Sequence, residues 1–137
     1  MHTMPLRLYP QQDLRRALEA VLAAEGVRAG FVLQGIGSLS LARIRYAGLD
    51  EPTEIRGDLE ILTLAGSLSP DGAHLHMSVA DAQGRVMGGH VAAGCIVRTT
   101  AEVLLALLPD VAFSRQPDAQ SGCNELVIRT MGNPDVA

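Results

Sequence analysis

The sequence predicts an α+β domain: a largely antiparallel mixed sheet of about seven strands with two main helices. Three observations support this fold class: short apolar runs separated by turn residues, two stretches with helical periodicity, and a length suited to one core. The chain has 137 residues, of which 47% are apolar and 19% charged, so its composition is that of a globular protein rather than a disordered tail or a coiled coil. We expect residues 1–137 to form a single domain.

The two predicted helices carry apolar side chains at helical spacing. Over residues 13–25 they recur at i, i+3, i+4, i+7 and i+8, as in a helix packed on one face. Gly26 follows where a glycine commonly ends a helix. A second helix is predicted over residues 99–109, because Glu102 stands three residues after Thr99 in the spacing of a capping box.

The remaining apolar runs predict strands. The expected strands are residues 6–9, 29–34, 39–46, 59–68, 74–80, 85–91 continuing as 95–98, 111–115 and 125–130. Only turn residues, 69–72 and 81–84, separate three of these runs, so successive antiparallel pairing is expected. The apolar phase changes within 39–46, which indicates a bulge. The loop 48–57 is expected to be exposed and the tail 132–137 disordered.

Charge and cysteine content exclude several classes of function. The formal net charge is −4, and the eleven basic residues are scattered arginines without a lysine; this disfavours autonomous nucleic-acid binding, which needs a basic face. Cys95 and Cys123 have no C-x-x-C spacing, so neither a disulfide framework nor a cysteine zinc site is indicated, and Cys95 is expected in the core. Neither a signal peptide nor a spanning apolar stretch is found, so we expect a cytoplasmic protein with no membrane partner.

Three of the four histidines fall in one short stretch, at His74, His76 and His90. Residues two apart in a strand point to the same face, so His74 and His76 present both imidazoles on one side. A two-residue turn at 82–83 would place His90 on the opposite face. A three-residue turn ending at Gly84 in the left-handed conformation pairs 81 with 85 and brings His90 opposite His76. We favour the second register, although a bulge at 88–89 would reverse it.

Three imidazoles with an open fourth position are typical of a catalytic zinc site. Zn²⁺ is therefore the first expectation for a divalent ion, with Ni²⁺, Fe²⁺ or Mn²⁺ as alternatives, because nitrogen ligands select weakly among them. The spacing alone also fits two simpler interpretations. The histidines could be ordinary surface residues, or polar residues at a contact between subunits.

The runs 60–68, 74–81 and 84–90, with H-L-H followed by G-G-H, resemble the plant-and-prokaryote conserved (PPC) domain, in its bacterial stand-alone form. The similarity extends over nearly the whole chain, because residues 37–38, 99–102, 113–115, Asp118 and 121–122 fall in the order of the family. Ser121 stands where the family usually has Thr, a change that keeps the hydroxyl. In plants this domain follows AT-hook motifs.

The resemblance implies a homotrimer and a distant fold relation to acetolactate decarboxylase, a zinc lyase whose metal is also held by three histidines. Carried onto this chain, the ligands are His74, His76 and His90. The resemblance assigns no reaction, since shared fold is not shared chemistry. Glu60, Arg98 and Arg115 are the best candidates for an acid, a base or a carboxylate clamp, but the preferred explanation of each is the simpler one, a solvated strand residue or a member of an ion pair.

Two functions follow from the sequence. The first is a metal-binding homotrimer with a small-molecule site at a three-histidine centre, where lyase or hydrolase chemistry would be possible. The alternative is a non-enzymatic module for oligomerisation or recruitment, associated with DNA by analogy with the plant relatives. The chain lacks the Arg-Gly-Arg-Pro core of an AT-hook, so its own residues disfavour direct DNA binding.

Overall fold

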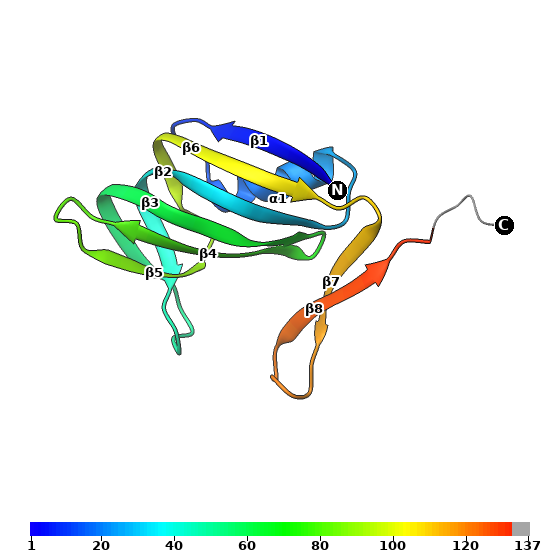
Figure 1. The fold of residues 1–137 in the computed structure, drawn as a ribbon. Helices are drawn as coiled ribbons and strands as arrows, with labels where there is room; N and C mark the ends of the chain where they lie inside the picture. Colours follow the sequence, from blue (N-terminus) through cyan, green and yellow to red (C-terminus); the bar gives the residue numbers. More distant parts are fainter. Residues whose placement is uncertain (133–137) are drawn as a thin grey trace.

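The structure of the protein is a computed structural model that describes residues 1–132. In these residues six strands form one antiparallel sheet, two more form a hairpin beside it, and one helix covers one face of the sheet (Figure 1). The elements follow in the order β1 (His2–Leu8), α1 (Leu14–Ala24), β2 (Gly30–Arg45), β3 (Thr53–Ser69), β4 (Gly72–Ala80), β5 (Val86–Val91), β6 (Ile96–Leu107), β7 (Val111–Pro117) and β8 (Asn124–Thr130). The tail expected to be disordered, 132–137, lies outside the described residues except for Gly132.

The strand order in the sheet is β1-β6-β2-β3-β4-β5, and the sheet curls so that β5 returns to β2. The last residues of β2 pair with β5 through Ile44–Val91 and Arg45–His90. Strands β2 to β5 therefore close on themselves at that end, in the manner of a small barrel. This closure brings Arg45 beside His90, although 44 residues of chain lie between them.

Helix α1 and the inward-facing side chains of the strands form the core. The helix contributes Leu14, Leu18 and Leu22, and the strands contribute a set of buried aliphatic residues that includes Leu39, Ile44, Leu59, Leu64, Leu68, Leu75, Val79, Leu105 and Leu107. Because side chains alternate along a strand, the intervening residues occupy the opposite face of the sheet. That face is turned away from α1 (Figure 1).

The first predicted helix is confirmed. The carboxylate of Asp13 caps its N-terminus by accepting a hydrogen bond of 3.1 Å from the amide of Arg16, as expected for an N-cap Asp. Gly26 has a φ of +66°, the left-handed conformation expected after the C-terminus. In the part of the chain that the structure describes, no helix is long and apolar enough to cross a membrane.

The second predicted helix, 99–109, is wrong: this segment belongs to strand β6, which also takes up the expected strand 95–98. In β6 the buried residues Ala101, Val103 and Leu105 alternate with the exposed Glu102 and Leu104. The segment thus has the period of a strand. The strand is hydrogen-bonded to β1 on one side and β2 on the other. This pairing stabilises the extended conformation more than the helix propensity of its Ala and Leu residues favours a helix.

The strands expected at 29–34 and 39–46 form one continuous strand, β2. The glycines between them are not turn residues. A Cβ atom at Gly35 would lie 2.9 Å from Leu64 Cδ2, and one at Gly37 would contact the carbonyl oxygen of Thr100, so both glycines permit close packing of neighbouring strands. The predicted bulge is confirmed by the register shift at Leu39/Leu41. Strand β3 begins inside the loop expected at 48–57. In total, the described residues contain eight strands and one helix.

Candidate metal centre

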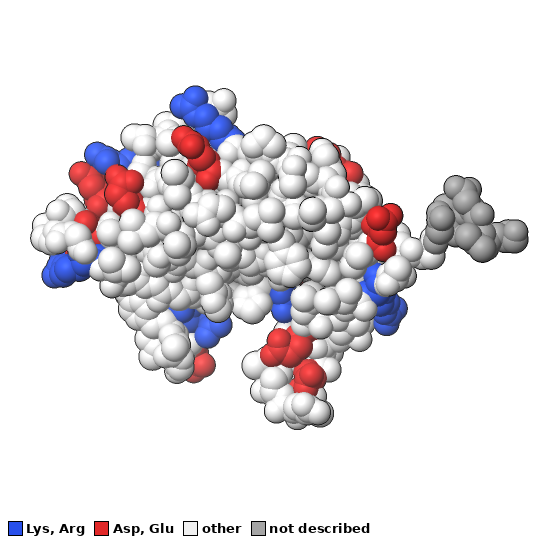
Figure 2. All heavy atoms as spheres, viewed as in Figure 1, with Lys and Arg blue, Asp and Glu red and all other residues white. Residues whose placement is uncertain are grey.

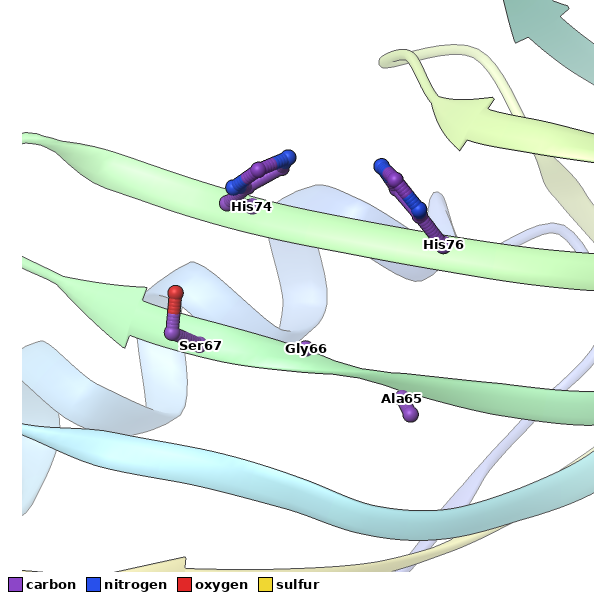
Figure 3. A pocket seen from close by; sticks show the side chains of 5 residues that line it. All are labelled: Ala65, Gly66, Ser67, His74 and His76. Carbon is purple, nitrogen blue, oxygen red and sulfur yellow. The ribbon is translucent and has the colours of Figure 1, made fainter. Parts of the chain in front are cut away.

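The three clustered histidines converge on the face of the sheet that is turned away from α1. His74 and His76 come from β4 and His90 from β5, and one ligand nitrogen from each lies within 4.8 Å of the other two. The ring centroids are 5.0 to 5.7 Å apart. Figure 3 shows the imidazoles of His74 and His76 leaning from β4 toward the same space, with Ser67 on the neighbouring strand. The arrangement can hold one ion between the three rings.

The predicted three-residue turn sets this geometry and is confirmed. His76 pairs with His90 across the β4–β5 ladder, and the amide of Asp81 donates to the carbonyl of Arg85 at 3.0 Å. Gly84 has a φ of +76°, the left-handed conformation that this turn requires. The Asp81 carboxylate stabilises the turn by accepting hydrogen bonds from the amides of Gln83 and Arg85 and from Arg85 Nε.

The two glycines before His90 allow β5 to fit between two neighbours. The β4–β5 ladder has no register shift at this point, so the bulge that would have turned His90 to the other face does not occur. A Cβ atom at Gly88 would contact the carbonyl of Met77 in β4, and one at Gly89 would lie 2.6 Å from the carbonyl of Arg45 in β2. The G-G-H sequence therefore lets β5 approach both strands closely and places His90 between them.

The surroundings of His74 and His90 favour their neutral imidazoles. Burial, together with the neighbouring His74 and the positive charge of Arg45, lowers the pKa of His90 to about 4. Burial and the charge of Arg115 lower the pKa of His74 below its ordinary value. Among the described residues, His90 Nδ1 is a buried side-chain nitrogen without a hydrogen-bond partner. A neutral imidazole nitrogen without a partner is the form that binds a metal ion.

Two hollows adjoin the cluster. The smaller one, about 280 Å³, is lined by His74 and His76 together with the β3 segment Ala65, Gly66 and Ser67 (Figure 3). The larger one, about 410 Å³, is lined by residues from α1, five strands and the β3–β4 and β7–β8 connections: Arg15, Arg45, Asp71, Gly72, Ala73, His74, His90, Arg115, Cys123, Asn124 and Glu125. Figure 2 shows a notch between the β2–β3 loop and the β7–β8 hairpin, with basic side chains near its top and acidic side chains on the hairpin.

One of the three residues expected to assist chemistry lies at this site. Arg115 lines the larger hollow; its Nη2 donates to Ser67 Oγ at 2.7 Å and its amide donates to Asp71 Oδ2 at 2.8 Å. Arg98 instead pairs with Asp58 at 3.1 Å. Glu60 lies opposite Ala80, and neither Glu60 nor Arg98 lines the two hollows beside the histidines. The strand register explains the position of Glu60, because Glu60 is seven residues along β3 from Ser67, which pairs with His74.

Sequence reasoning missed two arginines at the site. Arg45 reaches it through the closure of β2 onto β5, and Arg15 reaches it from α1, where its Nη1 donates to the carbonyl of Val91 at 2.9 Å, next to His90. Both contacts join segments far apart in the chain, so no local pattern indicates them. Cys95 is buried in the core as expected, and burial raises the pKa of its thiol to about 11. Cys123 is exposed.

Comparisons with known proteins agree with the fold and with the resemblance. The model of the Plants and Prokaryotes Conserved (PCC) domain matches residues 1–109. The chain is 50% identical over 131 residues to the bifunctional protein GlmU of a Synechococcus strain, covering 95% of this chain. It spans about a fifth of the length of that relative, 21%.

Two solved structures show the same architecture over nearly the full chain. A hypothetical protein from Salmonella enterica is 40% identical with a TM-score of 0.91, over 94% of each chain. A metal-containing protein from Archaeoglobus fulgidus is 28% identical with a TM-score of 0.75, over 93% of this chain and 94% of that one. The extent of the family match, together with these likenesses, shows that the chain belongs to the Plants and Prokaryotes Conserved domain family.

Proposed function

We propose that this protein is a metal-binding domain in which His74, His76 and His90 hold one divalent ion, with zinc as the first expectation. The observation that carries the proposal is the convergence of three ligand nitrogens within 4.8 Å, one ring having a buried nitrogen without a partner. A buried polar atom without a partner costs about 1–3 kcal/mol, and a cation between the rings would remove that cost. The metal-containing relative from Archaeoglobus fulgidus supports the same conclusion.

The donor set fits a borderline-soft ion. Three neutral imidazoles, with neither cysteine among them, suit Zn²⁺, and also Ni²⁺ or Fe²⁺. When bound at such a site, the ion would polarise a carbonyl group or lower the pKa of a water molecule. The chain itself supplies the rest of the site. The two hollows leave room for a small molecule beside the histidines, and Ser67 and Asp71 fix Arg115 at the rim.

Metal analysis of the purified protein tests the proposal. We expect about one zinc or other transition-metal ion per chain after loading and removal of excess, and loss of that ion in the variants His74→Ala and His90→Ala. His2→Ala is the matched control, because His2 lies in β1 outside the cluster. A wild-type protein that holds no metal at stoichiometric level overturns the proposal.

We further propose that the domain assembles as a homotrimer, as the family resemblance implies. The sheet face turned away from α1 supports this, because it carries almost no charged side chains (Figure 2). The exposed apolar side chains of β2, β3 and β6 are Phe31, Leu33, Ile36, Leu62 and Leu104, and the exposed Glu102 lies opposite Ile36. Phe31 pairs with Ser67, and Ser67 pairs with His74, so this surface continues directly into the histidine cluster. A second copy on this face would lie beside the metal centre.

The alternative function is a module for oligomerisation or recruitment without enzymatic activity, associated with DNA. The sheet face with few charged side chains (Figure 2) favours assembly under this alternative as well. The net charge of −4 and the scatter of the arginines along the sequence disfavour binding of the phosphate backbone. A gel shift with random duplex DNA at low ionic strength distinguishes the two: tight binding with a steep salt dependence would favour the DNA-associated module.

A further inference from the structure

We propose that the hollow lined by Arg15, Arg45 and Arg115 binds a small dicarboxylate, which lies between the arginines and the metal centre. The inference rests on the proposed function, because the ion on the histidines forms one side of the site. A hollow of about 410 Å³ is within the size range of small-molecule sites in proteins, about 300–1,000 Å³.

The charges around the hollow favour an anionic ligand. Three guanidinium groups and two carboxylates, those of Asp71 and Glu125, line the hollow, and one of the three, that of Arg15, is paired with Glu19. Asp71 already accepts a hydrogen bond from the amide of Arg115. A divalent ion on the neutral histidines would add to the positive side, since bound cations are often the largest local charges in a site. The loaded hollow therefore has an excess of positive charge that an anionic ligand would balance.

The arginines Arg45 and Arg115 are free to bind such a ligand. Among residues 1–132, neither of their side chains forms an ion pair with a carboxylate. Arg45 Nη1 donates to the carbonyl of Leu49 and Arg115 Nη2 donates to Ser67 Oγ, which leaves most of the donors of each guanidinium available. Arg15 differs, because it already pairs with Glu19 at 3.0 Å.

The positions of these two arginines indicate a ligand with two acid groups. Arg45 pairs with His90 across the β2–β5 ladder, and Arg115 is bonded to Ser67, the cross-strand partner of His74. The two positive groups thus flank the histidine cluster from different strands. A guanidinium binds a carboxylate through two parallel hydrogen bonds, so a short dicarboxylate can engage both arginines while one of its oxygens faces the ion.

Binding of malonate to the zinc-loaded protein, measured by isothermal titration calorimetry, tests this site. We expect binding of malonate, and no binding of the uncharged malonamide. The variants Arg45→Gln and Arg115→Gln should each weaken malonate binding about tenfold or more, because each removes a charge-assisted hydrogen-bonding partner. Arg98→Gln is the matched control and should leave the affinity unchanged, since Arg98 pairs with Asp58 outside the hollow.

Zinc content is measured on the same samples, so that the two proposals are judged separately. Loss of malonate affinity with retained zinc in the arginine variants supports the dicarboxylate site. Wild-type protein that holds zinc but binds no malonate, or binds inorganic phosphate in its place, overturns it and leaves the metal centre standing. If the wild type holds no zinc, the same variants are titrated without metal, and equal malonate binding by all of them overturns the site. Because Arg115 also supports the hairpin, Arg45→Gln decides the matter if Arg115→Gln does not fold.

Discussion

His76 lies directly opposite His90 in the ladder between β4 and β5. This relationship depends on the length of the turn that joins the two strands, because a shift of one residue would carry His90 to the core face. The turn is held by the carboxylate of Asp81, which accepts three hydrogen bonds from Gln83 and Arg85. The geometry of the metal centre therefore depends on a residue outside it.

Replacing Asp81 should destabilise the protein in a pH-dependent way. Hydrogen bonds from the amide and the side chain of Arg85 hold the pKa of Asp81 below its ordinary value of 3.8. A lowered pKa stabilises the fold above pH 3.8, and this contribution is lost as the pH falls through the pKa of the folded state. We expect Asp81→Asn to lower the free energy of unfolding at pH 7, and this difference from wild type should shrink below pH 3.8.

Urea unfolding of both proteins at neutral and acidic pH measures this difference. Asp50→Asn, in the exposed loop between β2 and β3, is the control for removing one negative charge. A loss of stability that is the same at both pH values would show that the charge of Asp81 contributes nothing to the turn.

A methyl group at Gly89 should disturb both the fold and the metal centre. In Gly89→Ala the new Cβ would lie 2.6 Å from the carbonyl of Arg45, so β5 must move away from β2. Crowding of this kind costs about 1–3 kcal/mol. We expect a lower melting temperature and weaker zinc binding. Gly132→Ala, whose Cβ would meet no atom within 4 Å, should change neither, and normal zinc affinity in Gly89→Ala would show that the β2–β5 closure does not position His90.

Much of the fold could be predicted from local patterns. The cap at Asp13, the glycine at 26 and the left-handed Gly84 each have a conformational reason that is readable from a few neighbouring residues. In the same way, the number of residues in the β4–β5 turn predicts that His76 lies opposite His90. These are short-range features, in which residue type and spacing determine the backbone.

What could not be predicted depends on long-range pairing. The segment of β6 matched a capped helix locally, and only its position between β1 and β2 makes it a strand. The glycines of β2 likewise act through strands that are distant in sequence. The same reason accounts for the site: Arg45 and Arg15 come to it through tertiary contacts, whereas Glu60 and Arg98, which were candidates by residue type, lie elsewhere.

The sheet face turned away from α1, which carries few charged side chains (Figure 2), provides the last prediction. Ile36 in β2 is 49% exposed. Strand β2 lies between β3 and β6, which carry the exposed Leu62 and Leu104. If a second copy covers this face, a charge at position 36 would therefore be buried. Burying an unpaired charge is strongly unfavourable, whereas a surface substitution changes monomer stability by about 0.5 kcal/mol or less. We therefore expect the wild type to sediment as a trimer, and Ile36→Glu as a folded monomer.

Analytical ultracentrifugation at micromolar concentration measures the assembly, and circular dichroism checks the fold of each variant. Leu49→Glu is the matched control, because Leu49 is likewise 49% exposed but lies in the loop between β2 and β3, and it should remain trimeric. A monomeric wild type would contradict the prediction outright. A trimer that survives Ile36→Glu would place the subunit contact on another surface, and the apolar side chains of β2, β3 and β6 would then stay exposed in the assembly.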